Sequence, residues 1–180
     1  MNYIFFDYND DTNEEYNIQG EDYRELLRVC FRYSEMCSVW FSPHIHWVEK
    51  LKPYEISVDP DRFEYAPPYG HEDEDKGDII IQLHFYRNCP ELHQLLVDYT
   101  YDIWNGWDYE QPAFLHFYRA DGTCFFMSDT HDGKCAFYPR VGEDISSVVS
   151  KAHWHCESEL RPGAIPSPRP DNYRPLEKKN

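Results

Sequence analysis

The sequence predicts an α+β protein in which three helices pack on one antiparallel sheet of about five or six strands. Three segments carry apolar side chains at helical spacing, several others are apolar or aromatic runs of strand length, and three of these runs follow one another closely in the C-terminal half. The 180 residues suit one domain, and 41% of them are apolar, which is enough for a core. We therefore expect residues 1–160 to form a single acidic domain and residues 161–180 to form a Pro-rich basic tail.

The first half of the chain contains one predicted helix and several predicted strands. Residues 21–37 carry leucines, a tyrosine and two cysteines at helical spacing, after two acidic residues that suit the first turn of a helix. Residues 3–8 are predicted as a short strand, residues 38–48 as extended, and residues 54–58 as a strand that ends at a turn. Residues 79–86 begin with three isoleucines, and a continuous apolar start is typical of a central strand.

Three aromatic runs in the second half predict a β-meander. Asp121-Gly122 and Asp132-Gly133 separate the runs. Asp-Gly between such runs predicts a type I′ hairpin turn, because both central positions of that turn need positive φ. The predicted strands are residues 114–119, 123–128 and 135–138.

The register of the first hairpin follows from the same turn. Pairing across Asp121-Gly122 places Phe117 opposite Phe126 on one face and Tyr118 opposite Phe125 on the other. Aromatic side chains on both faces predict that each face of the meander is at least partly covered.

Two further helices are predicted on either side of the meander. Residues 90–104 begin with a proline, which fits the first turn, and continue with leucines on one face. Residues 143–154 begin with two acidic residues and carry isoleucine, valines and alanine on one face.

Cysteine spacing and hydropathy predict a reduced, cytoplasmic protein. Six cysteines are present and none forms a CxxC pair, so we expect thiols that pack as small apolar side chains. The N-terminus has no basic region before an apolar stretch, and no run approaches the roughly 20 apolar residues of a membrane helix. We expect neither a signal peptide nor a membrane span.

The acidic charge is the strongest compositional feature. The formal net charge is −16, and residues 161–180 hold five basic and two acidic side chains, so the other 160 residues carry −19. A field of this sign repels nucleic acid phosphates and anionic membranes, and it attracts cations. We therefore expect a basic protein partner, no direct nucleic acid contact and no membrane contact.

Two segments are candidates for contact with such a partner. One interleaves tryptophan and tyrosine with carboxylates, and such aromatic residues are enriched at binding hot spots. The other is a run of acidic residues. The alternatives are tryptophans that cap the core, and an acidic loop that is solvated or that, together with Asp78, binds a hard cation such as Ca²⁺. The predicted partner-binding residues are Asp102, Trp104, Trp107, Asp108, Tyr109 and Glu110 in the first segment and Glu72, Asp73, Glu74 and Asp75 in the second.

Histidine clusters leave metal binding open as an alternative. His44 and His46 are two residues apart, and His153, His155 and Cys156 follow near the end of the domain. If the two clusters met, they would offer the nitrogen and sulfur ligands that tetrahedral zinc prefers. His-x-His also arises readily in a chain with nine histidines, so surface histidines are the competing interpretation, and we assign no cofactor from sequence.

The motifs of common enzyme classes are absent. The sequence contains no P-loop, GxGxxG, GxSxG, HExxH or EF-hand pattern, and we assign no catalytic residue. Together with the charge, this favours an acidic inhibitor of immunity or antitoxin type that neutralises a basic partner such as a nuclease toxin. In size and charge the chain resembles bacterial immunity proteins, without a shared motif, and a phage protein that mimics nucleic acid is a variant of this hypothesis. An adaptor subunit that docks through the Pro-rich tail is the remaining alternative.

Overall fold

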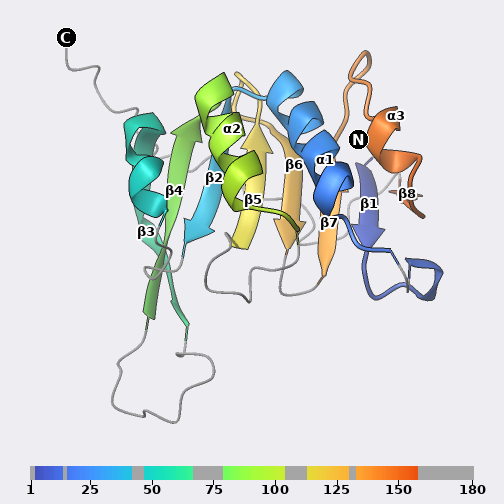
Figure 1. The fold of residues 1–180 in the computed structure, drawn as a ribbon, viewed down its shortest axis with the longest axis horizontal. Coiled ribbons are helices and arrows are strands. Elements are labelled where there is room, and N and C mark those ends of the chain that lie inside the picture. The colour runs from blue at the N-terminus through green and yellow to red at the C-terminus, as the bar shows by residue number, and fades with distance from the viewer. Residues whose placement is uncertain are drawn as a thin grey trace.

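The computed structural model describes residues 3–13, 16–41, 47–66, 79–103, 113–129 and 133–157. These ranges form one sheet with the strand order β3-β4-β2-β5-β6-β7-β1-β8, in which every neighbouring pair is antiparallel (Figure 1). In chain order the strands and α-helices are β1 (Tyr3–Asp7), α1 (Gly20–Tyr33), β2 (Met36–Phe41), β3 (Glu55–Ala66), β4 (Ile79–Arg87), α2 (Pro90–Tyr99), β5 (Ala113–Tyr118), β6 (Cys124–Asp129), β7 (Lys134–Phe137), α3 (Ser146–Val149) and β8 (His155–Glu157).

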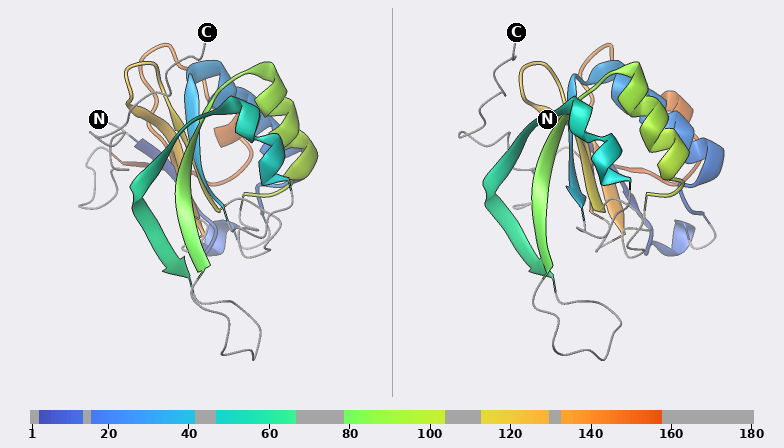
Figure 2. Two further views of the ribbon diagram at one scale, coloured as in Figure 1. Left: turned by 90° about the vertical axis from the view of Figure 1, so that its left-hand side faces the viewer. Right: turned by 60° about the vertical axis from the view of Figure 1, so that its left-hand side comes forward.

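The helices cover one face of the sheet, as both views in Figure 2 show. Apolar side chains spaced three or four residues apart on α1 and α2 meet aromatic side chains of the strands, and this cluster is the main core. Its burial is the dominant favourable term in folding. The helices contribute Tyr23, Leu26, Leu27, Leu92 and Leu96, and the strands contribute Phe6, Phe117, Phe126 and Phe137.

The opposite face of the sheet carries two smaller apolar clusters. Tyr118 belongs to one and Tyr138 to the other, and these side chains are 1% and 4% exposed. Both faces of the meander are therefore buried at these positions. The buried members are Met36, Leu83, Phe85 and Tyr118 in one cluster and Tyr3, Ala136 and Tyr138 in the other.

The α+β class and the antiparallel sheet are confirmed, but the predicted number of strands is wrong. The described part of the chain contains eight strands. β3 spans 12 residues where residues 54–58 were expected. β8 has three residues, lies at the edge of the sheet and pairs with β1. The sequence contains no apolar run that would indicate such a short strand. It forms because it pairs with β1, which lies near the other end of the chain.

All three helices are shorter than predicted. α1 ends at Tyr33 because Ser34 adopts an extended conformation and its hydroxyl donates back to the carbonyl of Cys30. The Glu35 N–H then donates to the carbonyl of Tyr118 at 2.9 Å, so Cys37 lies in β2 and not in the helix. α2 ends at Tyr99, where the next residue is also extended, and α3 has four residues.

The first hairpin of the meander confirms one predicted pair and corrects the other. Phe117 pairs with Phe126, but Tyr118 pairs with Cys124 because the register shifts between them. Phe125 is the extra residue of this bulge. It packs in the main core, with its ring centroid 5.5 Å from that of Phe137.

The turn of this hairpin also differs from the predicted type I′. The Arg119 N–H donates to the Thr123 carbonyl and the Gly122 N–H donates to the Arg119 carbonyl, both at 2.9 Å. These bonds enclose the three residues 120–122, and Gly122 has φ of 80°. A three-residue loop with glycine in the left-handed region accounts for both the shifted register and the Asp-Gly signal.

Replacing Gly122 with alanine is expected to lower the free energy of unfolding by about 1–2 kcal/mol, because an L side chain is strained at this φ. Urea unfolding measures the loss. Asn tolerates the left-handed region better, so Gly122→Asn is the matched control and should lose clearly less. Equal losses for the two variants would show that the backbone conformation is not the cause.

The cysteines are free thiols, three of them buried in the core. Burial raises the pKa of Cys30, Cys37 and Cys135, so these side chains are neutral packing groups. In the ranges that the structure describes, no helix is both long and apolar enough to cross a bilayer. The cytoplasmic location stays a prediction, as does the division into a domain and a tail at residue 160.

Candidate functional site

Strand direction brings most of the acidic connections to one end of the sheet, which we call the acidic end. It is formed by the last residues of β1, β2, β3 and β6 and the first residues of β4, β5 and β7. The register fixes this arrangement, because these strand ends pair with one another across the sheet. The pairs are Ala66 with Ile79, Phe41 with Gln82, Trp40 with Ala113, Asp129 with Lys134, and Asp7 with Lys134.

Both predicted partner-binding segments attach to the acidic end. Glu72 to Asp75 fall between β3 and β4, and Trp104 to Glu110 fall between α2 and β5. β4 and β5 start on either side of β2, about 10 Å apart across the sheet. β4 begins four residues farther out than β5, because Trp40 pairs with both Leu83 and Ala113. Trp104, Trp107, Asp108, Tyr109, Glu110 and Glu72 to Asp75 lie outside the described residues, and their contact with a partner stays a prediction.

Asp102 is the predicted partner-binding residue that the structure describes. Its side chain is 8% exposed and accepts a 2.6 Å hydrogen bond from Asn17 Nδ2. Its backbone forms an antiparallel bridge with Gln19. These contacts fasten the segment before α1 to the segment after α2, so the geometry favours a structural role for this carboxylate.

The other end of the sheet, which we call the balanced end, carries charges of both signs among the described residues. The side chains there include four arginines and six carboxylates, and the closest pairs neutralise one another. Arg119 lies 2.6 Å from Glu143, and Arg140 lies 2.6 Å from Asp121. The residues are Arg32, Arg87, Arg119, Arg140, Glu35, Glu55, Glu91, Asp121, Glu143 and Asp144.

Two histidines and one aspartate meet beside the acidic end, at the β8 edge. Asp10 lies in the turn after β1, His153 precedes β8, and His155 is the first residue of β8. One potential ligand atom from each residue lies within 4.8 Å of the other two. We call these three residues the Asp-His-His cluster.

Asn13 holds the two chain segments of the cluster together. Its side chain is 1% exposed. Its Oδ1 accepts the His153 N–H at 3.1 Å, and its Nδ2 donates to the carbonyls of His153 and Asp7, each at 3.1 Å. The Asn13 N–H donates to the Asp10 carbonyl at 2.7 Å. The backbone on both sides of the cluster is thus fixed by one buried amide.

The side chain of His155 is oriented by two contacts. Its ring stacks on Phe5 with centroids 4.8 Å apart and planes 20° apart. Its Nε2 lies 2.6 Å from Oδ2 of Asp10, as a hydrogen bond to the carboxylate. The ring of His153 stands edge-on to that of His155, with centroids 4.6 Å apart. His153 is exposed, so the cluster opens to solvent.

The predicted histidine clusters are therefore confirmed in part. His153 and His155 do come together, whereas Cys156 pairs with Ile4 on the alternate side of β8 and is not part of the group. His44 and His46 lie outside the described residues. Asp10 was not predicted as a ligand, because 145 positions separate it from His155 and no sequence signal links them.

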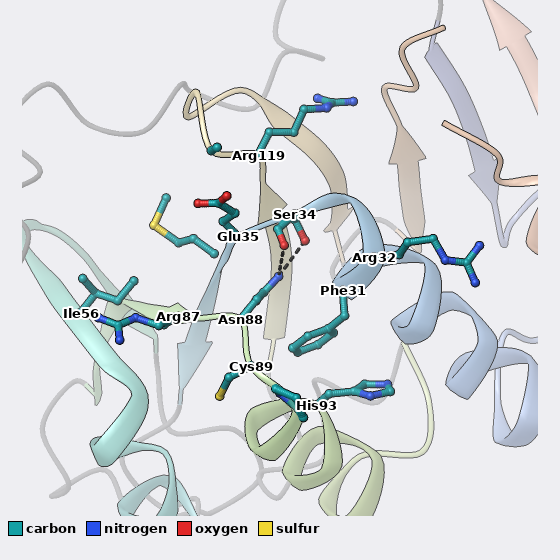
Figure 3. Close-up of a pocket in the computed structure, with 13 residues that line it drawn as sticks. Phe31, Arg32, Ser34, Glu35, Ile56, Arg87, Asn88, Cys89, His93 and Arg119 are labelled. Atoms are coloured by element: carbon teal, nitrogen blue, oxygen red, sulfur yellow. Dashed lines mark hydrogen bonds between the residues drawn. The ribbon is translucent and has the colours of Figure 1, made fainter. Parts of the chain in front are cut away.

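A cavity of about 740 Å³ lies at the balanced end, between the end of α1 and the start of α2 (Figure 3). Asn88 Nδ2 crosses it to donate to Ser34 Oγ at 2.7 Å and to the Ser34 carbonyl at 3.1 Å. Figure 3 shows the guanidinium groups of Arg32 and Arg119 pointing away from it. Burial lowers the pKa of His93, and Arg28 adds to this effect. Asn88 Oδ1 and His93 Nε2, which also belong to the lining residues, are buried and have no hydrogen-bond partner among the residues that the structure describes.

No protein family matches this chain, and neither a curated protein nor a solved structure matches it.

Proposed function

We propose that this protein acts by binding a basic protein partner at the acidic end of its sheet, as an inhibitor of immunity or antitoxin type. The observation that carries this proposal is that the strand ends gather the acidic connections at one end, while the other end combines arginines with carboxylates in ion pairs. The working case is a cationic nuclease toxin.

Negative charge concentrated at one end of a protein acts mainly while a partner approaches, before the two proteins touch. A negative field concentrated at one end orients a cationic partner before contact and raises its association rate. Each basic side chain that forms an ion pair cancels one carboxylate, and the field comes from the excess carboxylates that give residues 1–160 their net charge of −19. The paired cations are Arg24, Arg28, Lys52, Arg119, Lys134, Arg140 and Lys151.

Aromatic residues next to the carboxylates supply the second half of the proposal. Trp104, Trp107 and Tyr109 belong to the segment that leads into β5. Aromatic anchors surrounded by charge are the usual composition of a tight protein interface, in which charge sets the association rate and the anchors set the dissociation rate.

Neutralising the acidic end is expected to weaken partner binding about tenfold, mainly through slower association. The test variant is Glu72→Gln, Asp73→Asn, Glu74→Gln. The partner is captured from the host lysate, purified, and its binding rates are measured at low and high salt.

A charge-matched variant at the balanced end is the control. Glu35, Glu91 and Asp144 are exposed there, and Glu35→Gln, Glu91→Gln, Asp144→Asn changes the net charge equally. This control should bind almost as the parent protein does. Equal weakening by both variants, or a captured partner that is not basic, would refute the proposal.

The tryptophans are tested by Trp104→Ala and Trp107→Ala on the same purified complex. As anchors they should each speed dissociation by tenfold or more. If binding is unchanged and the free energy of unfolding falls instead, these side chains belong to the core and the acidic run alone carries the contact.

A further inference from the structure

We propose that Asp10, His153 and His155 form a binding site for one zinc ion. The site is separate from the proposed partner contacts in the connections before β4 and β5, since it lies at the β8 edge of the sheet. It replaces the ligand set expected from sequence, because it recruits Asp10 and leaves out Cys156.

The ligands suit zinc in number and kind. Two imidazoles and one carboxylate are common zinc ligands, and three protein ligands leave the fourth tetrahedral position for water. Imidazole nitrogen favours zinc over magnesium and calcium, which prefer oxygen ligands. A zinc ion with these ligands carries one net positive charge, which the acidic surroundings stabilise.

The backbone is organised for the site before any ion arrives. The side-chain amide of Asn13 fixes the backbone of His153, its backbone N–H fixes the carbonyl of Asp10, and the pairing of β8 with β1 fixes His155. Because these contacts are made by backbone and by a non-ligand side chain, metal binding does not have to break them. Ligands that are held in advance lose less conformational entropy on binding.

Small side-chain movements complete the geometry. The three ligand atoms lie within 4.8 Å of one another, and tetrahedral zinc needs them about 3.3 Å apart. His153 is exposed and free to turn its ring toward the other two. The zinc ion takes the place of the hydrogen between His155 Nε2 and Asp10 Oδ2, and the ring keeps one proton at Nδ1, so that it binds the ion as a neutral imidazole.

A second histidine–carboxylate pair in the chain provides an internal comparison. His84 Nδ1 lies 2.8 Å from Glu55 Oε2, and both side chains are partly buried, as are those of His155 and Asp10. Within the described ranges this pair belongs to no group of three potential ligands. A third ligand is thus what distinguishes the Asp-His-His cluster from an ordinary hydrogen-bonded pair.

Bound zinc would fasten the last strand to the first turn. β8 has three residues and pairs on one side only within the described sheet, so its attachment is weak. The ion links this strand to Asp10, near the other end of the chain. A ligand that binds the folded state raises the melting temperature, and at a hundredfold excess over Kd the rise should be about 5 °C or more.

The test is calorimetric titration of the metal-free full chain with Zn²⁺, together with thermal unfolding with and without the ion. We expect one tight site per chain and a raised melting temperature. His153→Ala removes an exposed ligand with little risk to folding, and Asp10→Asn keeps the shape of the side chain. Each should weaken zinc binding at least tenfold and cancel the thermal shift.

Two controls decide whether the cluster is responsible. His84→Gln removes a histidine from the comparison pair and should leave zinc binding unchanged. His44→Gln with His46→Gln tests the other sequence-predicted pair. Parent-like zinc binding in both His153→Ala and Asp10→Asn, or loss of binding in the His44 and His46 variant alone, would overturn the proposal.

Co²⁺ loaded in place of Zn²⁺ should give the intense visible absorption of a tetrahedral site, and this spectrum should be lost in His153→Ala.

Discussion

Replacing Phe137 with alanine is expected to lower the free energy of unfolding by about 3–5 kcal/mol, enough to threaten the whole fold. The side chain is fully buried on the helix-covered face. Its ring centroid lies 4.8 Å from that of Phe126, 5.5 Å from Phe125 and 5.6 Å from Trp154. Truncation leaves a cavity that three large rings cannot fill by small movements, so both transfer energy and packing are lost.

Chemical unfolding monitored by tryptophan fluorescence measures this loss. Phe137→Leu keeps most of the apolar volume and should lose much less than the alanine variant. Val141 is fully exposed, and Val141→Ala should change the free energy of unfolding by less than about 0.5 kcal/mol. A loss of less than about 1 kcal/mol in the free energy of unfolding of Phe137→Ala would show that the aromatic side chains of the meander contribute little to the stability of the core.

The sequence predicts those parts of the fold that local patterns determine. The apolar side chains of α1 and α2 recur at helical spacing, and the aromatic runs of the meander have the length of strands. The structure contains all of these elements. The errors in strand pairing arise where one additional residue in a loop changes the register. Phe125 was placed opposite Tyr118 because a two-residue turn was assumed. The three-residue loop shifts the pairing as far as Tyr118 with Cys124, and the bulge at Phe125 restores the predicted register at Phe117 with Phe126.

The candidate sites were predictable to different degrees for the same reason. The spacing of His153 and His155 is local and was recognised, whereas Asp10 joins them through contacts across most of the chain. The acidic run and the tryptophans were recognised by composition, but their attachment to one end follows from strand order, which composition does not determine. Asp102 was chosen for its charge, and its burial results from a bridge to Gln19.

Removing the side chain of Arg119 is expected to cost about 3–5 kcal/mol of stability, because it would leave the Glu143 carboxylate without its ion-pair partner and with only the Arg140 N–H as a donor among the described residues. Arg119 is 7% exposed. It donates to both carboxylate oxygens of Glu143, at 2.7 and 2.6 Å, and to the carbonyls of Cys124 and Tyr138, each at 2.7 Å. One guanidinium thereby joins the first hairpin, the end of β7 and the segment before α3. Arg119→Leu keeps apolar volume and tests the polar contacts specifically.

The pH dependence of this pair separates its charge from its packing. The hydrogen bonds from Arg119 hold the pKa of Glu143 below its ordinary value, against the opposing effect of burial. A depressed carboxyl pKa stabilises the fold above the unfolded value of about 4.3, and this contribution is lost as the pH falls through the folded value. A double-mutant cycle of Arg119→Leu and Glu143→Leu should therefore give a coupling energy near pH 7 that shrinks below about pH 4. The double variant should be more stable than Arg119→Leu alone, since an apolar pair leaves no buried charge unpaired. A coupling energy that does not change with pH would show that the contact is held by shape and not by charge.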